Sequence, residues 1–190
     1  NVKGEVVLGT YTISSAKTAT THFVIPKGVL YAKSGSGSMA FNGPTEIGLY
    51  QVFSGFSAGD VTFGSGTAIE PSPEWWQTNT TPGTTDMLAA VNSAARSIRP
   101  EVDANSRAGG IVRFSAERYT VKGKIIGFPG VVFKGQGHYF LGSGTRKVTW
   151  IDHQPTVTGT DCFEFGLSAW DTYGRAAKCG VTDMYNSGTA

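Results

Sequence analysis

The chain has 190 residues, with 16 Lys and Arg against 14 Asp and Glu, and a formal net charge of +2. Its basic residues are scattered, without the concentrated positive charge that phosphate binding needs, so nucleic acid is not an expected partner. No apolar run approaches the ~20 residues that cross a bilayer, so no membrane insertion is expected. With 26 glycines and 16% charged residues, the composition favours turns and strands over exposed helices.

Residues 1–70 predict a small β segment. Short β-prone runs are separated by Gly, Pro, Asn and Ser, and the Gly/Ser stretch 33–38 is interpreted as a turn between two strands. The predicted strands are Glu5–Leu8, Tyr11–Ile13, His22–Ile25, Val29–Ala32, Met39–Phe41, Leu49–Phe53 and Val61–Phe63.

Residues 71–84 are expected to connect this segment to the rest, because the dense prolines around Trp75 and Trp76 exclude a helix interior and a central strand. A helix is predicted over 86–98, with Thr84 or Thr85 as its N-cap. Its apolar residues recur at helical spacing and are expected to face a core: Met87, Val91, Ala94 and Ile98.

After the helix, short strands are predicted again. They are Ile111–Phe114, Tyr119–Val121, Val131–Phe133, Val148–Ile151, Cys162–Phe165 and Val181–Met184. Runs this brief suit a solenoid, in which each strand stacks on its equivalent in the next coil and the stacked coils share one core. A weak internal echo agrees: residues 24–37 and 127–137 both pass from a proline turn through Gly-Val into a strand that ends in glycines.

Several motifs in order resemble the amino-terminal region of the pectate-lyase-like superfamily, which includes phage tailspikes. They are Gln51-Val-Phe53, Pro73-Glu-Trp-Trp76, the capped helix, Gly109-Gly-Ile-Val-Arg-Phe114 with Tyr119, and Val131-Val-Phe-Lys-Gly-Gln-Gly137. The chain departs from the family pattern at Gln77, at the helix start and at residues 115–118. The resemblance covers about residues 45–190. It implies a mainly β fold: the start of a right-handed parallel β-helix over 85–190, opened by a capping helix.

The function implied by the resemblance is that of the N-terminal head and capping region of a phage tailspike or tail appendage. Such a region would be structural and homotrimeric, would contact other virion tail or baseplate proteins, and would join the virion to a downstream β-helix that binds host surface polysaccharide. The alternatives are a polysaccharide depolymerase, hydrolase or lyase, with its active site in later coils, and a secreted bacterial surface protein with an adhesive function. The sequence starts at Asn1 without a methionine, so a processed or truncated chain is expected.

No catalytic, cofactor or metal-binding residue is assigned. Trp75 and Trp76 are candidates for ligand binding, because aromatic faces stack on sugars, but packing against the helix is the favoured interpretation. The later carboxylates are each expected to lie on the surface or in a turn: Asp152, Asp161, Glu164, Asp171 and Asp183. His22, His138 and His153 show no metal-ligand spacing. Cys162 and Cys179 are expected to be buried thiols rather than a disulfide, and no cofactor is expected.

Overall fold

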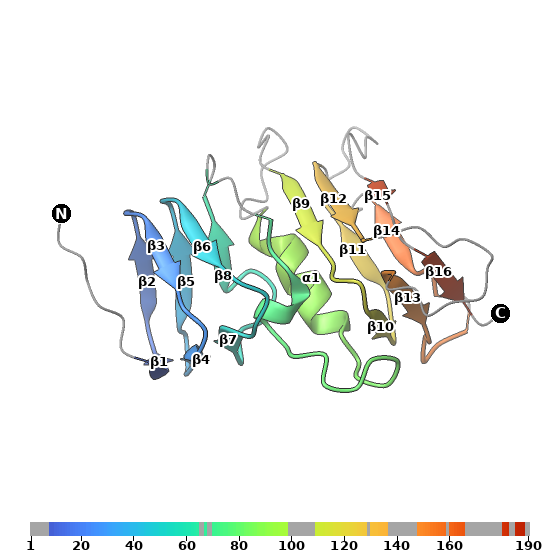
Figure 1. The fold of residues 1–190 in the computed structure, drawn as a ribbon, viewed down its shortest axis with the longest axis horizontal. Helices are drawn as coiled ribbons and strands as arrows, with labels where there is room; N and C mark the ends of the chain where they lie inside the picture. Colours follow the sequence, from blue (N-terminus) through green and yellow to red (C-terminus); the bar gives the residue numbers. More distant parts are fainter. Residues whose placement is uncertain are drawn as a thin grey trace.

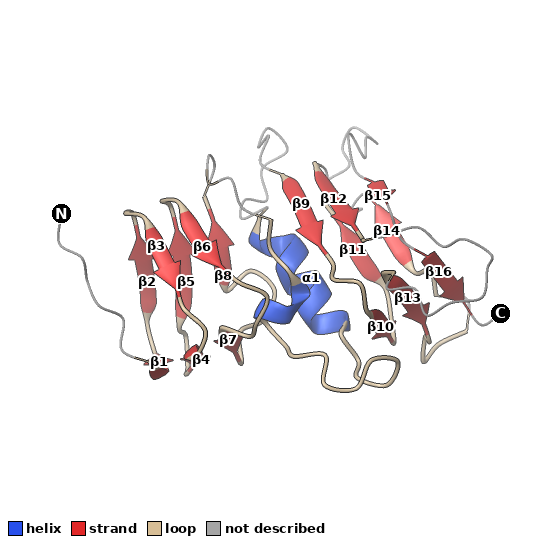
Figure 2. Cartoon of the chain, viewed as in Figure 1, coloured by secondary structure: helices blue, strands red, loops and turns tan. Residues whose placement is uncertain are grey.

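A computed structural model describes residues 8–64, 67, 70–98, 109–128, 130–136, 148–158, 160–165, 180–182 and 185–188. Within these residues the chain is mainly β, with parallel sheets and one α-helix (Figures 1 and 2). The mainly β prediction is therefore confirmed. The helix lies between two groups of strands, one formed by the chain before it and one by the chain after it (Figure 1).

The first group of strands comes from residues 8–64. Each strand pairs in parallel with the strand three places later, which gives the sheets β1-β4-β7, β2-β5-β8 and β3-β6. The strands are β1 (Gly9–Ile13), β2 (Ala16–Ala19), β3 (Phe23–Ile25), β4 (Val29–Lys33), β5 (Ser38–Phe41), β6 (Thr45–Ile47), β7 (Phe53–Ser54) and β8 (Val61–Phe63).

The second group follows a short 3₁₀ helix, η1 (Pro73–Trp75), and the α-helix, α1 (Leu88–Ser97). It obeys the same pairing rule, with sheets β9-β12-β15, β10-β13-β16 and β11-β14, all parallel. Its strands are β9 (Gly110–Arg113), β10 (Arg118–Val121), β11 (Ile125–Gly127), β12 (Val131–Lys134), β13 (Trp150–His153), β14 (Phe163–Phe165), β15 (Gly180–Thr182) and β16 (Tyr185–Gly188).

One hydrophobic cluster runs from the first group of strands, past the helix, into the second. Alternate residues of β4 and β5 are buried, as expected for strands with one face toward a core. Parallel register then places aromatic side chains of neighbouring strands on one another. Phe41 stacks on Phe63 with ring centroids 5.2 Å apart, and Tyr31 stacks on Phe53 with ring centroids 6.3 Å apart. The shared cluster means that the two groups do not have separate cores.

Successive turns of the chain approach one another closely at Gly37. A Cβ built there would lie 1.9 Å from the carbonyl oxygen of Ile13, in the strand that β4 stacks upon. Since this neighbour is backbone rather than a flexible side chain, only glycine fits without moving β1.

The internal echo corresponds to a repeated turn. Gly28 and Gly130 both have positive φ, 99° and 85°. In both turns the residue that starts the strand bonds back across the turn, with Val29 N donating to Pro26 O at 3.3 Å and Val131 N to Phe128 O at 3.0 Å. The two copies open β4 and β12, which occupy equivalent places in the two groups.

Most predicted strands are present, with shifted ends. The turn at 34–37 is confirmed, since Gly37 N donates to Ser34 O at 3.1 Å between β4 and β5. The prediction of a strand over Leu49–Phe53 is wrong for most of its length, because β7 begins only at Phe53. Residues 5–7, 183 and 184 of the predicted strands lie outside the described residues. Four strands were not predicted: β2, β6, β11 and β16.

Candidate functional site: the junction around the helix

The helix begins at Leu88 with Met87 as its N-cap residue, and a carboxylate rather than a threonine binds its first N–H. Asp86 Oδ1 accepts hydrogen bonds from the backbone N–H of Leu88 at 3.1 Å and of Lys122 at 3.3 Å. The predicted cap by Thr84 or Thr85 is therefore wrong; Thr85 Oγ1 instead accepts from Thr81 N at 3.1 Å. Asp86 also places a negative charge at the positive end of the helix dipole. Its contact with Lys122 ties the helix start to the second group of strands.

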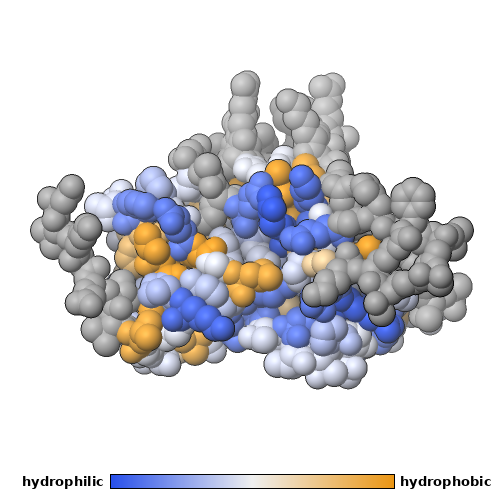
Figure 3. Space-filling model, viewed as in Figure 1, coloured by the Kyte–Doolittle hydropathy of each residue, from blue (hydrophilic) through white to orange (hydrophobic). Residues whose placement is uncertain are grey.

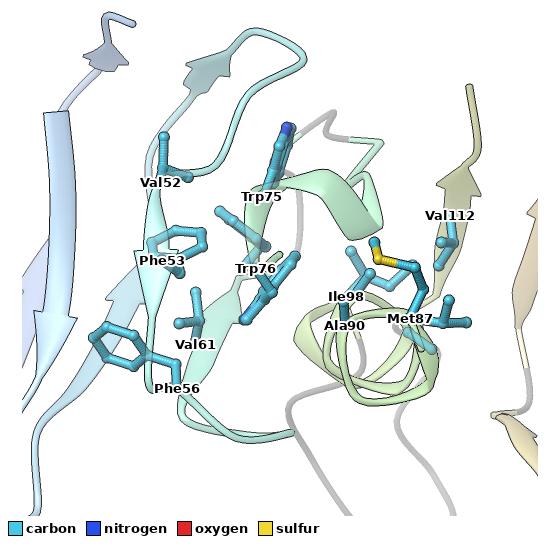
Figure 4. Close-up of a cluster of buried hydrophobic side chains, with 14 of the residues drawn as sticks. Val52, Phe53, Phe56, Val61, Trp75, Trp76, Met87, Ala90, Ile98 and Val112 are labelled. Atoms are coloured by element: carbon cyan, nitrogen blue, oxygen red, sulfur yellow. The ribbon is translucent and has the colours of Figure 1, made fainter. Parts of the chain in front are cut away.

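The predicted apolar stripe of the helix is confirmed, and the buried surface is wider than the stripe. Met87, Val91, Ala94 and Ile98 are all buried, and so are Ala90, Ser93, Ala95 and Ser97. The helix contacts η1 and β8 on one side and β11 on the other. Figure 4 shows this arrangement, with Phe53, Val61 and Trp76 to one side of the helix and Val112 to the other. Small residues around the helix allow both groups of strands to approach it closely.

The strands β9, β10 and β11 are the first of their sheets, so each would present one unpaired edge. Segments of the junction, which is the chain from residue 70 to residue 98 that carries η1 and α1, pair with all three strands. Pro71 O accepts from Arg113 N of β9 at 2.9 Å, and Asp86 forms an isolated parallel bridge with Thr120 of β10. Backbone polar groups left unpaired at a strand edge invite pairing with another chain, and these contacts remove that opportunity.

Asn92 of α1 covers the edge of β11 with a single side chain. Its Nδ2 donates to Lys124 O at 3.2 Å, and its Oδ1 accepts from Ile126 N at 2.9 Å. A side-chain amide carries a donor and an acceptor, as a backbone residue does, so Asn92 replaces the partner strand that β11 lacks on this side. The first group of strands is closed from the same junction, since Val52 N donates to Trp75 O at 2.9 Å beside β7.

The two tryptophans lie in the core on the side of the first group of strands. Trp75 is 4% and Trp76 7% exposed. Trp76 packs on Phe53 with centroids 5.2 Å apart, and Trp75 packs edge-on against Phe63 at 5.8 Å. Trp75 Nε1 donates to Gly48 O at 2.9 Å, which fixes the ring. These contacts are those expected from the packing interpretation, and the small exposed fraction of each ring leaves little surface for stacking on a sugar.

A buried carboxylate, not singled out from the sequence, connects η1 to β10. Glu74 Oε1 accepts from Ser115 Oγ at 2.8 Å and from Tyr119 Oη, and its Oε2 accepts from Ser72 Oγ. Burial, and next the nearby Glu74 charge, raise the pKa of Tyr119 far above its ordinary value, so its hydroxyl stays protonated and donates. The carboxylate of Glu74 and the hydroxyls bound to it are buried, which suits a structural connection and not a substrate site.

The later carboxylates are not brought into a catalytic pair by the described residues. Asp152 is buried in β13, so its expected position on the surface or in a turn is wrong; its Oδ2 accepts from Arg118 Nη2 and from Gln154 Nε2, both at 2.7 Å. Asp161 is exposed. The side chain of Glu164, and Asp171 and Asp183 entirely, lie outside the described residues.

The histidines and cysteines form no shared site among the described residues. His22 pairs with Glu46 at 2.8 Å, while His153 is buried. His138 and Cys179 lie outside the described residues. Cys162 is a half-buried free thiol, and burial raises its pKa to about 11. No cluster of three or more potential metal ligands occurs in the part of the chain that the structure describes.

Within the described ranges, no helix has the length and apolar character that crossing a membrane requires. Comparison of the chain with protein-family models, with curated proteins and with solved structures finds no match.

Proposed function

We propose that the chain is a segment of a right-handed parallel β-helix, interrupted by α1, that serves as the structural head and capping region of a phage tailspike or tail appendage. The observation that carries the proposal is the pairing rule: on both sides of α1, each strand pairs in parallel with the strand three places later. A solenoid with three short strands per coil has this pattern, because every strand stacks on its equivalent in the next coil.

The chemistry of the junction supports a structural role. Its buried or capping carboxylates are taken up by hydrogen bonds that hold the fold, with Glu74 bound by hydroxyls and Asp86 by backbone N–H groups. Both tryptophans are used in packing. The junction thus ends one stack of strands and begins another, which is the task of a capping region.

In the proposed role the chain forms a homotrimer in the virion tail, contacts other tail or baseplate proteins, and presents a downstream β-helix to host surface polysaccharide. Trimer formation and virion location rest on the resemblance of the sequence motifs, and the parallel stacking is compatible with them.

The test is the oligomeric state of the purified chain, measured by light scattering coupled to size exclusion at micromolar concentration. A mass of three chains is expected, and a monomer over the whole concentration range would contradict the head-region assignment. The same protein is incubated with bacterial capsule and lipopolysaccharide. New reducing ends or unsaturated sugars would favour the depolymerase alternative, whereas the structural proposal expects neither product.

A further inference from the structure

Exposed apolar side chains gather at the corner where the chain turns from β3 into β4 and from β6 toward β7. Five large hydrophobic side chains are exposed within the described residues, and three of them lie at this corner or beside it. These three, which we call the corner patch, are Leu8 at 64%, Val24 at 50% and Leu49 at 61%. Figure 3 shows hydrophobic and hydrophilic residues side by side over the face that carries β3 and β6.

The corner patch follows the direction in which the strands stack. The turns that open β1, β4 and β7 lie one above another, because these strands pair in parallel register. Leu8 of the first turn contacts the second, where a Cβ built at Gly28 would lie 3.5 Å from Leu8 Cδ2. Leu49 belongs to the third turn, and its neighbour Tyr50 reaches back toward the second by donating from Oη to Ile25 O at 2.5 Å. The exposed apolar side chains therefore form a row along the stack.

Val24 widens this row on the side of β3. It lines the same open pocket as Tyr50, so it lies next to the third turn. Charged side chains border the row, because Lys27 of the second turn is exposed and Glu46 lies opposite Val24 in the neighbouring strand. An apolar centre with a polar rim is the usual anatomy of a protein–protein interface.

We propose that the corner patch is the surface through which copies of this chain associate side by side, with their stacks aligned. A row of apolar side chains along the stack is the surface that two neighbouring stacks remove from water, whereas a ligand held at one turn would use a single coil. The inference rests on the proposed homotrimer and deepens it. Three corners can meet around one threefold axis, which brings the same residues of all copies together.

The test compares the parent chain with Leu49→Glu by light scattering coupled to size exclusion over a range of concentrations. Leu49 is exposed and lies outside the strands, so the fold of a single chain does not need its apolar side chain. In the assembly, the variant would bring like charges together at an apolar contact, which disfavours association. The concentration at which half of the chains are associated is expected to rise at least about tenfold.

Two further variants sharpen the test. Val24→Thr keeps a β-branched side chain in β3 but replaces a methyl group by a hydroxyl, and combined with Leu49→Glu it should weaken association more than either change alone. Val157→Glu is the matched control, because Val157 is 66% exposed and lies between β13 and β14, outside the corner patch. It should keep the mass of the parent chain. Circular dichroism checks that each variant folds.

The outcomes separate the two proposals. A parent mass of three chains that the folded double variant retains would overturn the corner patch and leave the head-region assignment standing. Equal loss of association in the Val157→Glu control would also overturn the corner patch, since added charge alone would then explain the effect. A parent chain that is monomeric at every concentration would overturn both proposals. Association of two chains, lost in Leu49→Glu and kept in the control, would support the corner patch and contradict the trimer.

Discussion

Replacing Asn92 by alanine tests whether the helix stands in for a strand at the edge of β11. The change removes one donor and one acceptor, and with them the hydrogen bonds to Lys124 O and from Ile126 N. Two hydrogen bonds at about 1 kcal/mol each give ~2 kcal/mol of lost stability. The better helix propensity of alanine returns up to about 0.7 kcal/mol. The expected net loss in the free energy of unfolding is therefore about 1–2 kcal/mol.

The measurement is urea unfolding followed by tryptophan fluorescence, where N92A should lower the midpoint without changing the slope. Asn42→Ala is the matched control, because Asn42 is exposed, and it should change stability by less than about 0.5 kcal/mol. Asn92→Asp keeps the acceptor for Ile126 N but sets a carboxylate against Lys124 O, so it should be at least as destabilising as N92A at neutral pH. Stability of N92A equal to that of the parent protein would refute the strand-substitute interpretation.

Three further results are expected. Tyr119→Phe removes a hydroxyl that donates to the buried Glu74 carboxylate, and should cost about 1–3 kcal/mol in urea unfolding; no loss would show that Glu74 does not need this donor. Gly37→Ala forces a Cβ against Ile13 O, and should give largely insoluble protein or a melting temperature lowered by several degrees. Normal expression with an unchanged melting temperature would contradict the close approach of the two backbones. Burial raises the pKa of Cys162 to about 11, so the thiol is mostly protonated at pH 8.5. In a variant that lacks the second cysteine, alkylation of Cys162 by iodoacetamide should therefore be far slower than alkylation of free glutathione, and should become faster as the pH rises. It should reach the glutathione rate only after unfolding.

The fold could be predicted where burial leaves a pattern in the sequence. Val29–Lys33 and Val131–Lys134 alternate buried and half-buried positions and follow a proline or glycine turn, so their strands are visible. The sequences Ala-Lys-Thr-Ala of β2 and Thr-Glu-Ile of β6 carry no apolar run. These strands are formed because a neighbour already lies beside them in parallel register, and sequence reasoning on one segment at a time does not contain that information.

The junction was predictable in outline and not in its contacts. Helical spacing identified the face that holds Met87 and Val91. Asn92, one residue later, is polar and looks like an ordinary exposed helix position until β11 is placed beside it. The sequence predicted a cap at Thr84 or Thr85, whereas the side chain of Asp86 binds the first N–H of the helix together with the backbone N–H of Lys122, which is distant in sequence.

Both groups of strands pack against α1, so the length of the helix constrains how the two groups are placed. An α-helix turns about 100° and rises ~1.5 Å for each residue. One residue added within Leu88–Ser97 would therefore rotate everything attached to its far end, and would remove either the η1 and β8 contacts or the β11 contacts from the buried surface. Insertions and deletions should be tolerated in the turns of either group long before they are tolerated here, because this short segment determines how one group of strands is placed relative to the other.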